Sequence, residues 1–253
     1  MRNRQVSIQK RIIFSVFAGI ACLFFFTCGI PVYYVIEPPV AEHIPTEDST
    51  DTSQRYFSFI CPYSASSENS EFTLSGTGIY YRIYDSSEAM ESDISSISSR
   101  NGEYSENGYL RMIELNYQPL ISNPANTPVI KKTSSSRTIR LWLLAEGEGV
   151  FPAGIYDYTN NPDTPFSVPV RSGAERSATS NENPGFQFTS NYVPLFGDSD
   201  TKFTIVTENT AREDYPNVWY VNLYAVTIGR EVNLSPHYSS LLHLGKLKIT
   251  YND

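Results

Sequence analysis

The chain contains few of the residue types that build disulfide frameworks and histidine-based metal sites, with three cysteines and three histidines among 253 residues. Two of the cysteines, Cys22 and Cys28, lie in an apolar N-terminal segment. Cys61 is then the one thiol of the remaining chain, and a single thiol cannot form an internal disulfide. Because Cys61 ends an apolar run that begins at Tyr56, we expect a small buried core residue there.

The chain also lacks the short motifs of common hydrolases and nucleotide-binding enzymes. It has no Gly-x-Ser-x-Gly elbow, no His-Glu-x-x-His and no phosphate-binding Walker loop. His237 and His243 are six residues apart across a loop and a strand, which is not the spacing of paired metal ligands on a helix. We therefore expect a protein that is not an enzyme and holds no metal or cofactor.

Basic residues are outnumbered, at 19 Lys and Arg against 27 Asp and Glu. Four of the basic residues lie within residues 1–27, so the rest of the chain has 15 against 27, a net charge of −12. A surface this acidic repels phosphate backbones and argues against nucleic acid as a partner. The remaining basic concentration is expected to protect a strand edge, with binding to an acidic partner or to lipid headgroups as the alternative. It consists of Lys131, Lys132, Arg137 and Arg140.

What the chain does have is a signal for export at its N-terminus. Arg2, Arg4, Lys10 and Arg11 precede an apolar stretch from Ile12 to Phe26, and Thr27 and Cys28 follow it. This is the order of a secretory signal that ends at a cysteine. The sequence Phe25-Phe26-Thr27-Cys28 resembles the prokaryotic lipoprotein box, in the loose form seen in spirochaetal lipoproteins. The resemblance implies cleavage before Cys28 and acylation of its thiol with a fatty acid such as palmitate.

Two alternatives to this anchor remain open. Cys22, preceded by Gly19-Ile20-Ala21, is the alternative acceptor of the lipid. An uncleaved transmembrane helix is the alternative to cleavage, because Ile12–Ile36 is 25 residues long without a charge and about 20 suffice to cross a bilayer. In each case the basic residues precede the apolar segment, which leaves the C-terminal bulk outside the cytoplasm. We expect attachment to a bacterial envelope membrane, inner or outer.

The composition divides the chain into three parts. Residues 1–27 are expected to form the signal peptide and residues 28–54 a lipid-anchored flexible tether. Glu37–Gln54 is rich in proline and acidic residues and lacks aromatics, which is typical of a flexible linker. Residues 55–253 are expected to form one exported β-sandwich-like domain, with residues 85–217 partly an insertion.

Apolar alternation and abundant aromatic residues predict a mainly β domain. In Ile79–Tyr84, Ile79, Tyr81 and Ile83 alternate with the residues between them. Asp85-x-x-Glu88 predicts the start of one short helix that ends near Gly102. Further strands are expected at Tyr56–Cys61, Phe72–Leu74, Tyr109–Leu115, Arg137–Leu144, Gly154–Tyr158, Phe166–Val170, Phe186–Thr189, Lys202–Thr207, Val218–Ile228 and Leu242–Tyr251.

Two of these strands carry a family resemblance. Trp219–Val226, with Trp219, Val221, Leu223 and Ala225 on one face, is similar to the strand that begins the final hairpin of a fibronectin type III domain. Gly78–Tyr84 is similar to an early central strand of the same family. The resemblance implies an antiparallel, fibronectin III/Ig-like β-sandwich with a large β-rich insertion and one short helix. The absence of repeating βαβ patterns argues against a two-lobed solute receptor.

Two functions are compatible with these features. The first is a non-catalytic binding, adhesion or envelope-structural module that recognises a protein or glycan. The second is an exported carbohydrate-active hydrolase whose carboxylates are brought together by the fold. Trp142, beside Arg140, and a tyrosine near Asp157-Tyr158 are the candidate ligand-binding aromatics. The acidic clusters Asn160–Asp163 and Asp198–Asp200 are expected to be solvated turns rather than calcium sites.

Overall fold

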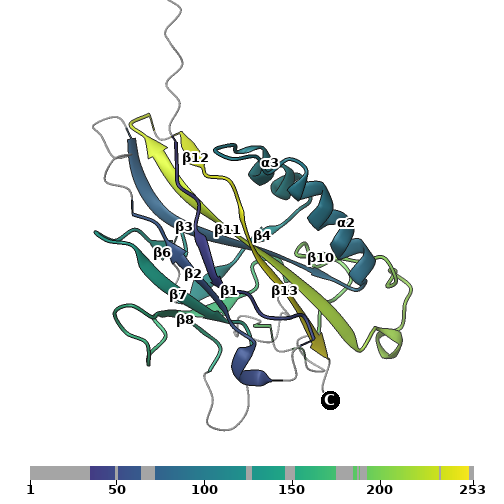
Figure 1. Cartoon of the computed structure of the whole chain (residues 1–253). Coiled ribbons are helices and arrows are strands. Elements are labelled where there is room, and N and C mark those ends of the chain that lie inside the picture. Colours follow the sequence, from purple (N-terminus) through teal and green to yellow (C-terminus); the bar gives the residue numbers. More distant parts are fainter. Residues whose placement is uncertain are drawn as a thin grey trace, which may run out of the picture. The chain divides into compact units, whose positions relative to one another are not determined.

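The computed structural model describes residues 35–48, 51–63, 72–123, 127–145, 152–174, 185–186, 188, 193–233 and 235–250. The predicted signal segment, with Cys22 and Cys28, lies outside these residues. Within them the chain is mainly β, with two antiparallel sheets and two α-helices (Figure 1). The mainly β class predicted from the sequence is therefore confirmed. No helix in this part of the chain is long and apolar enough to cross a membrane.

Two long strands, β3 and β11, form the centre of the fold. They pair antiparallel from Phe72, opposite Glu231, to Tyr84, opposite Tyr220. Shorter strands extend this central sheet on both sides, and of these β10 runs parallel to β3. The central sheet contains β3 (Phe72–Tyr84), β4 (Gln118–Pro119), β6 (Ile130–Lys131), β10 (Thr201–Lys202), β11 (Val218–Glu231), β12 (Pro236–Tyr238) and β13 (Leu242–Thr250).

A second sheet, which we call the outer sheet, packs on one face of the central sheet. Its four described strands lie in the order β1 (Val40–His43), β2 (Phe57–Cys61), β7 (Arg137–Trp142) and β8 (Gly154–Asp157). Smaller elements complete the fold: the pair β5 (Ile121–Asn123) and β9 (Val168–Val170), and the 3-10 turns η1 (Thr52–Gln54) and η2 (Arg212–Asp214).

Alternation along the strands separates two hydrophobic cores. On β11, Trp219, Val221, Leu223 and Ala225 are fully buried between the two sheets, which confirms the face predicted for them. The main core also contains the alternating side chains of β2, β3 and β7, and Cys61 is buried among them as expected. Each apolar strand face is thus removed from water by the opposite sheet, the arrangement of a β-sandwich.

Helices cover the other face of the central sheet (Figure 1). The helix α2 (Ser87–Ser98) contributes Met90 and Ile97 to this second core, and α3 (Asn107–Glu114) contributes Met112. These side chains pack with Tyr84, Tyr117, Tyr224, Val226 and Leu241. The domain therefore has three layers, in the order outer sheet, central sheet and helices.

The described chain contains two α-helices, whereas the sequence predicted one. The N-cap of α2 is Ser86, whose side chain accepts a hydrogen bond from the Ala89 amide, rather than Asp85. The predicted strand Tyr109–Leu115 is the helix α3. Its apolar residues also fit a helical spacing, and Gly108 and Met112, one turn apart, face the core.

The expectation of a flexible tether is wrong for the described part of Glu37–Gln54. Val40–His43 pair with β2, Ile36 is 3% exposed, and the Glu47 carboxylate lies 2.8 Å from Lys246 on β13. A segment rich in proline and acidic residues is ordered here because strand pairing, burial of Ile36 and the ion pair of Glu47 hold it against the rest of the domain. Proline is tolerated beside an edge strand such as β1.

The region between β3 and β11 is not separate from the sandwich. It supplies both helices and also β7 and β8, which make up half of the described strands of the outer sheet. The expected strand Lys202–Thr207 is limited to β10, and Phe186 and Phe188 contribute to the main core from outside the strands.

Candidate functional site

A buried arginine–aspartate cluster ties two long loops to the central sheet. A terminal nitrogen of Arg171 lies 2.7 Å from an Asp198 oxygen and 2.8 Å from an Asp200 oxygen, and all three side chains are at most 2% exposed. The Tyr81 hydroxyl on β3 donates a 2.6 Å hydrogen bond to Asp200. The expectation of a solvated turn at Asp198–Asp200 is therefore wrong. Because Arg171 compensates both carboxylates out of reach of solvent, the cluster has a structural role.

A second buried network lies between the central sheet and the helices. Its hydrogen bonds connect Lys202, Asp93, Tyr84, Tyr117, Asn222 and His243. Arg82 adds a 3.3 Å ion pair to Asp93 and a hydrogen bond to the Leu115 carbonyl. Burial lowers the pKa of His243 to about 4, so its imidazole is neutral at pH 7 and donates to Asn222. Apart from the Arg82 Nε, which has no hydrogen-bond partner among the described residues, these groups bond to one another, which is typical of a network that fixes helix position.

The solvent-facing side of the outer sheet carries an arginine–tyrosine cluster, defined by Arg140, Tyr56 and Tyr158. The guanidinium carbon of Arg140 lies 3.4 Å from the ring centre of Tyr158 and 4.8 Å from that of Tyr56. Both distances are within the range of cation–π interaction. Tyr158 is 40% exposed, so the cluster is open to solvent on that side.

The strand register explains why these side chains meet. Ile139 and Leu141 on β7 point into the main core, so Arg140 between them points outward. Phe57 pairs with Leu141, which places Tyr56 at the position opposite Trp142 and diagonal to Arg140. Tyr158 follows β8 directly, and its amide donates to the Thr138 carbonyl of β7.

Trp142 does not have the exposure expected for a ligand-binding aromatic. It is 2% exposed, and the Tyr56 ring lies 5.0 Å from it, centre to centre. On its other side Trp142 pairs with Gly154. The ring is therefore covered by its cross-strand neighbour and is not available to stack on a ligand. Tyr158, the second aromatic candidate from the sequence, is available.

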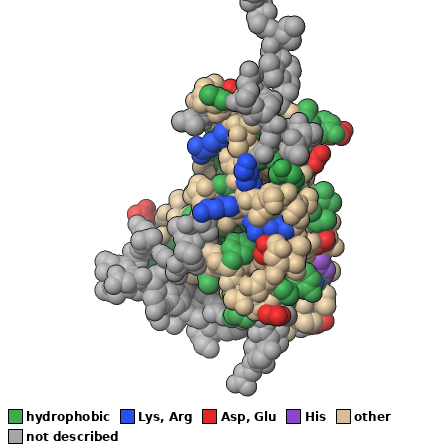
Figure 2. All heavy atoms as spheres, turned by 90° about the vertical axis from the view of Figure 1, so that its left-hand side faces the viewer, with side chains coloured by type: hydrophobic (Ala, Val, Ile, Leu, Met, Phe, Trp, Pro, Cys, Tyr) green, Lys and Arg blue, Asp and Glu red, His purple; other side chains and the backbone are tan. Residues whose placement is uncertain are grey.

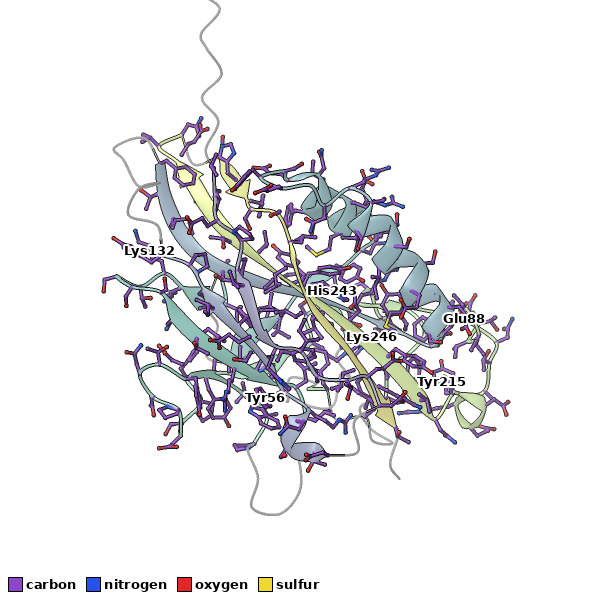
Figure 3. The ribbon with its side chains drawn as sticks, viewed as in Figure 1. Tyr56, Glu88, Lys132, Tyr215, His243 and Lys246 are labelled. Carbon is purple, nitrogen blue, oxygen red and sulfur yellow. The ribbon has the colours of Figure 1, made fainter. Side chains whose placement is uncertain are left out.

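The four basic residues of the predicted cluster have different environments. Arg137 forms a 2.8 Å ion pair with Asp157. Burial raises the pKa of Asp157, but hydrogen bonds from Asn160 and Arg137 outweigh this effect and the net shift is downward. Lys131 and Lys132 are exposed, and Figure 3 shows Lys132 far from Tyr56.

Arg140 differs from Arg137 because no carboxylate of the described residues pairs with it. Its Nε is buried and has no hydrogen-bond partner in this part of the chain. Lys and Arg side chains gather on the side of the molecule that lies at left in Figure 1 and faces the viewer in Figure 2. On a chain with a net charge of −8, this side is a local concentration of positive charge.

The two histidines named from the sequence, His237 and His243, have different environments. His237 lies between two carboxylates, 2.8 Å from Glu231 and 3.2 Å from Glu106, and is 30% exposed. His243 belongs to the buried network. No group of three or more His, Cys, Asp or Glu side chains among the described residues is arranged to hold a metal ion.

A cavity of about 530 Å³ lies between the end of α2 and the start of α3. Ser99, Arg100, Gly102, Ser105, Asn107, Leu110 and Glu114 line it. Arg100 and Glu114 are 3.5 Å apart and each is 54% exposed, so their charges are largely compensated in solvent. This cavity is a weaker candidate than the arginine–tyrosine cluster.

Sequence reasoning named Arg140 and Tyr158 but did not bring them together with Tyr56. The signal that was available is the alternation of β2 and β7, which places Tyr56 and Arg140 on the outward face once the two strands are paired. The buried networks around Arg171 and Asp93 have no comparable local signal, because their partners are far apart in the chain. Comparison of the chain with protein-family models, curated proteins and solved structures gives no match.

Proposed function

We propose that the chain is a lipoprotein, anchored in a bacterial envelope membrane through Cys28, whose β-sandwich domain binds a ligand without catalysis. The observation that carries the binding role is the arginine–tyrosine cluster. A guanidinium with no partnered carboxylate in the described chain, set against two tyrosine rings, is pre-arranged to receive an anionic group. Arginine and tyrosine are also enriched among the residues that dominate binding energy.

The chemistry of the cluster favours a glycan that carries a carboxylate. Arginine binds planar carboxylates with two parallel hydrogen bonds, and the exposed face of Tyr158 offers an apolar surface to a sugar ring. The rest of the domain is acidic, so a polymer with many negative charges is repelled. A short oligosaccharide with one or two uronic acid residues fits this balance best.

The test measures binding of uronic acid oligosaccharides and neutral oligosaccharides to the soluble domain, residues 35–253, by calorimetry. We expect binding of the acidic set and its loss in Arg140→Met, with a weaker but measurable effect of Tyr158→Ala. Arg230→Met is the matched control, since Arg230 is exposed at the end of β11 and lies outside the cluster. The control is expected to bind as the wild type does.

Binding that is unchanged in Arg140→Met, with the same unfolding midpoint, would contradict the proposed site. The alternative hydrolase is tested on the same samples by following the release of reducing ends. If the purified domain releases reducing ends, and substitution of one of its carboxylate residues abolishes this release, the domain is an enzyme and not a binding module.

The anchor is tested separately in cells fed with a fatty-acid analogue. We expect labelling of the wild type and of Cys22→Ala, and no labelling of Cys28→Ala. Labelling that persists in Cys28→Ala and is lost in Cys22→Ala would move the anchor to Cys22. Absence of labelling in every variant, with the chain still in the membrane fraction, would favour the uncleaved transmembrane helix.

A further inference from the structure

Three exposed apolar residues lie at the end of the domain where the chain arrives from its N-terminal segment. Val35 is 53%, Tyr104 60% and Val232 72% exposed. They come from three separate parts of the chain: the start of the domain, the connection between α2 and α3, and the turn between β11 and β12. We call them the apolar end residues.

Contacts among their neighbours place these residues together. Ile36, next to Val35, packs in one cluster with Phe72, and Phe72 pairs with Glu231, next to Val232. His237 on β12 contacts both Glu231 and Glu106, which links the β11–β12 turn to the start of α3. A hydrogen bond with Glu103 raises the pKa of Tyr104, and the Glu37 carboxylate adds to this rise, so Tyr104 lies near the start of the domain. Figure 1 shows β12 and α3 at the same end of the molecule.

The connection between the anchor and this end is short. Because Ile36 is already part of a buried cluster, at most the residues from Cys28 to Val35 separate the proposed anchor from the folded domain. Seven peptide steps span at most about 25 Å even when fully extended. The connection contains Tyr33 and Tyr34, a residue type that is enriched at the membrane–water interface.

We infer that this short connection holds the apolar end residues against the lipid surface, so that the domain rests on the bilayer by the end formed by Val35, Tyr104 and Val232. The inference rests on the proposed membrane anchor. It holds equally for an uncleaved transmembrane helix, because that helix would leave no longer connection before Ile36.

Charge at this end does not provide the attraction. Glu37, Glu103, Glu106 and Glu231 lie there; among the described residues, His237 contacts Glu106 and Glu231, and Arg230 precedes Glu231. Acidic groups are repelled by anionic headgroups. The contact is therefore expected with uncharged phosphatidylcholine and should not increase when anionic lipid is added.

The experiment uses the full chain, isolated from membranes and reconstituted in phosphatidylcholine vesicles. An environment-sensitive fluorophore is attached to Val232→Cys or Tyr104→Cys, and quenching by a lipid-borne quencher is measured. Cys61 does not compete for the label, because burial raises the pKa of its thiol to about 12. Ile205→Cys is the matched control, since Ile205 is 61% exposed but lies against Asp85, before the start of α2.

We expect several-fold stronger quenching at residues 232 and 104 than at residue 205. Equal quenching at all three sites, with the protein still floating with the vesicles, would overturn the inference. A label at residue 232 that is shielded from both water-soluble and lipid-borne quenchers would also overturn it, and would indicate that a second copy of the chain covers this end.

A second variant tests whether the short connection is what holds the apolar end residues against the lipid. Insertion of about 20 Gly and Ser residues between Tyr34 and Val35 adds a flexible spacer with a typical span of about 25 Å. We expect quenching at residue 232 to fall several-fold while the chain remains attached. Unchanged quenching would show that the connection is not what holds the domain there. Failure of the anchor is recognised independently, because the chain would then no longer float with the vesicles.

Discussion

Arg171 shows how one side chain sets the position of distant segments. Its guanidinium binds Asp198 and Asp200, which are 27 and 29 residues away, and Tyr81 joins Asp200 to the central sheet. In the sequence these aspartates have the composition of a solvated turn. Nothing local distinguishes an aspartate that will meet a distant arginine from one that will meet water, so this cluster could not be predicted.

Replacement of Arg171 by Met should lower the free energy of unfolding by about 3–5 kcal/mol, because two carboxylates would remain buried without a compensating charge. Urea unfolding of residues 35–253 measures this loss. Arg100→Met is the control, since the ion pair of Arg100 with Glu114 is exposed and is expected to contribute less than about 1 kcal/mol. Equal effects of the two substitutions would contradict the structural role given to Arg171.

His243 should make stability depend on pH. Its pKa is about 4 in the folded domain and about 6.5 when unfolded, so between these values the unfolded chain binds a proton that the folded chain does not. Stability therefore falls as the pH is lowered through this range, by up to about 2 kcal/mol between pH 7.5 and pH 5.

The measurement compares urea unfolding of the wild type and His243→Gln at both pH values. Glutamine retains a donor toward Asn222 and does not titrate, so the variant should lose less stability at pH 5. The same pH dependence in both proteins would show that other groups dominate.

At the scale of elements, long alternating strands were predictable and short or ambiguous segments were not. The faces of β3 and β11 follow from period-two alternation, because every second side chain must enter the same core. The segment Tyr109–Leu115 has apolar residues that satisfy both a strand and a helical period, and only the packing of Met112 against the central sheet decides for α3. The cluster of Arg140 with Tyr56 and Tyr158 depends on the register between strands, which sequence periodicity does not contain.

The junction of α2 and α3 has little room for an added methyl group. A Cβ at Gly108 would lie 2.4 Å from the Asn101 side-chain oxygen, and that side chain is held by hydrogen bonds of 2.8 and 2.9 Å to the Leu241 backbone. We expect Gly108→Ala to lower the free energy of unfolding by about 1–3 kcal/mol, although alanine is the better helix former. Gly102→Ala is the control, because its Cβ would meet its nearest atom, on Ser105, at 3.7 Å. A more stable Gly108→Ala would show that Asn101 is free to move.

At the scale of the whole molecule, the domain begins earlier than the composition indicates. The segment before Arg55 contributes Ile36 to a buried cluster, β1 to the outer sheet, and Glu47 to contacts with β13. Proline and acidic residues are typical of linkers, and the sequence has no local feature that reveals pairing with β2.

A chain that begins at Val35 should therefore be more stable than one that begins at Arg55. Both are expected to give a circular dichroism spectrum dominated by β structure. Loss of β1 and of the buried Ile36 should lower the melting temperature of the shorter chain by about 5–10 °C. Equal melting temperatures would mean that residues 35–54 add nothing to the folded domain, and a strongly helical spectrum would contradict the fold.

The pairing of β3 with β11 also has a consequence for how the protein is made. About 130 residues separate the end of β3 from the start of β11, so at a synthesis rate of ~5–20 residues per second the first strand waits roughly 7–26 seconds for its partner. Through that interval its backbone edge is unpaired and open to association with other chains. A nascent chain therefore cannot close its central sheet until its last strands have been made, and we expect a holding chaperone to limit association through this edge during that interval.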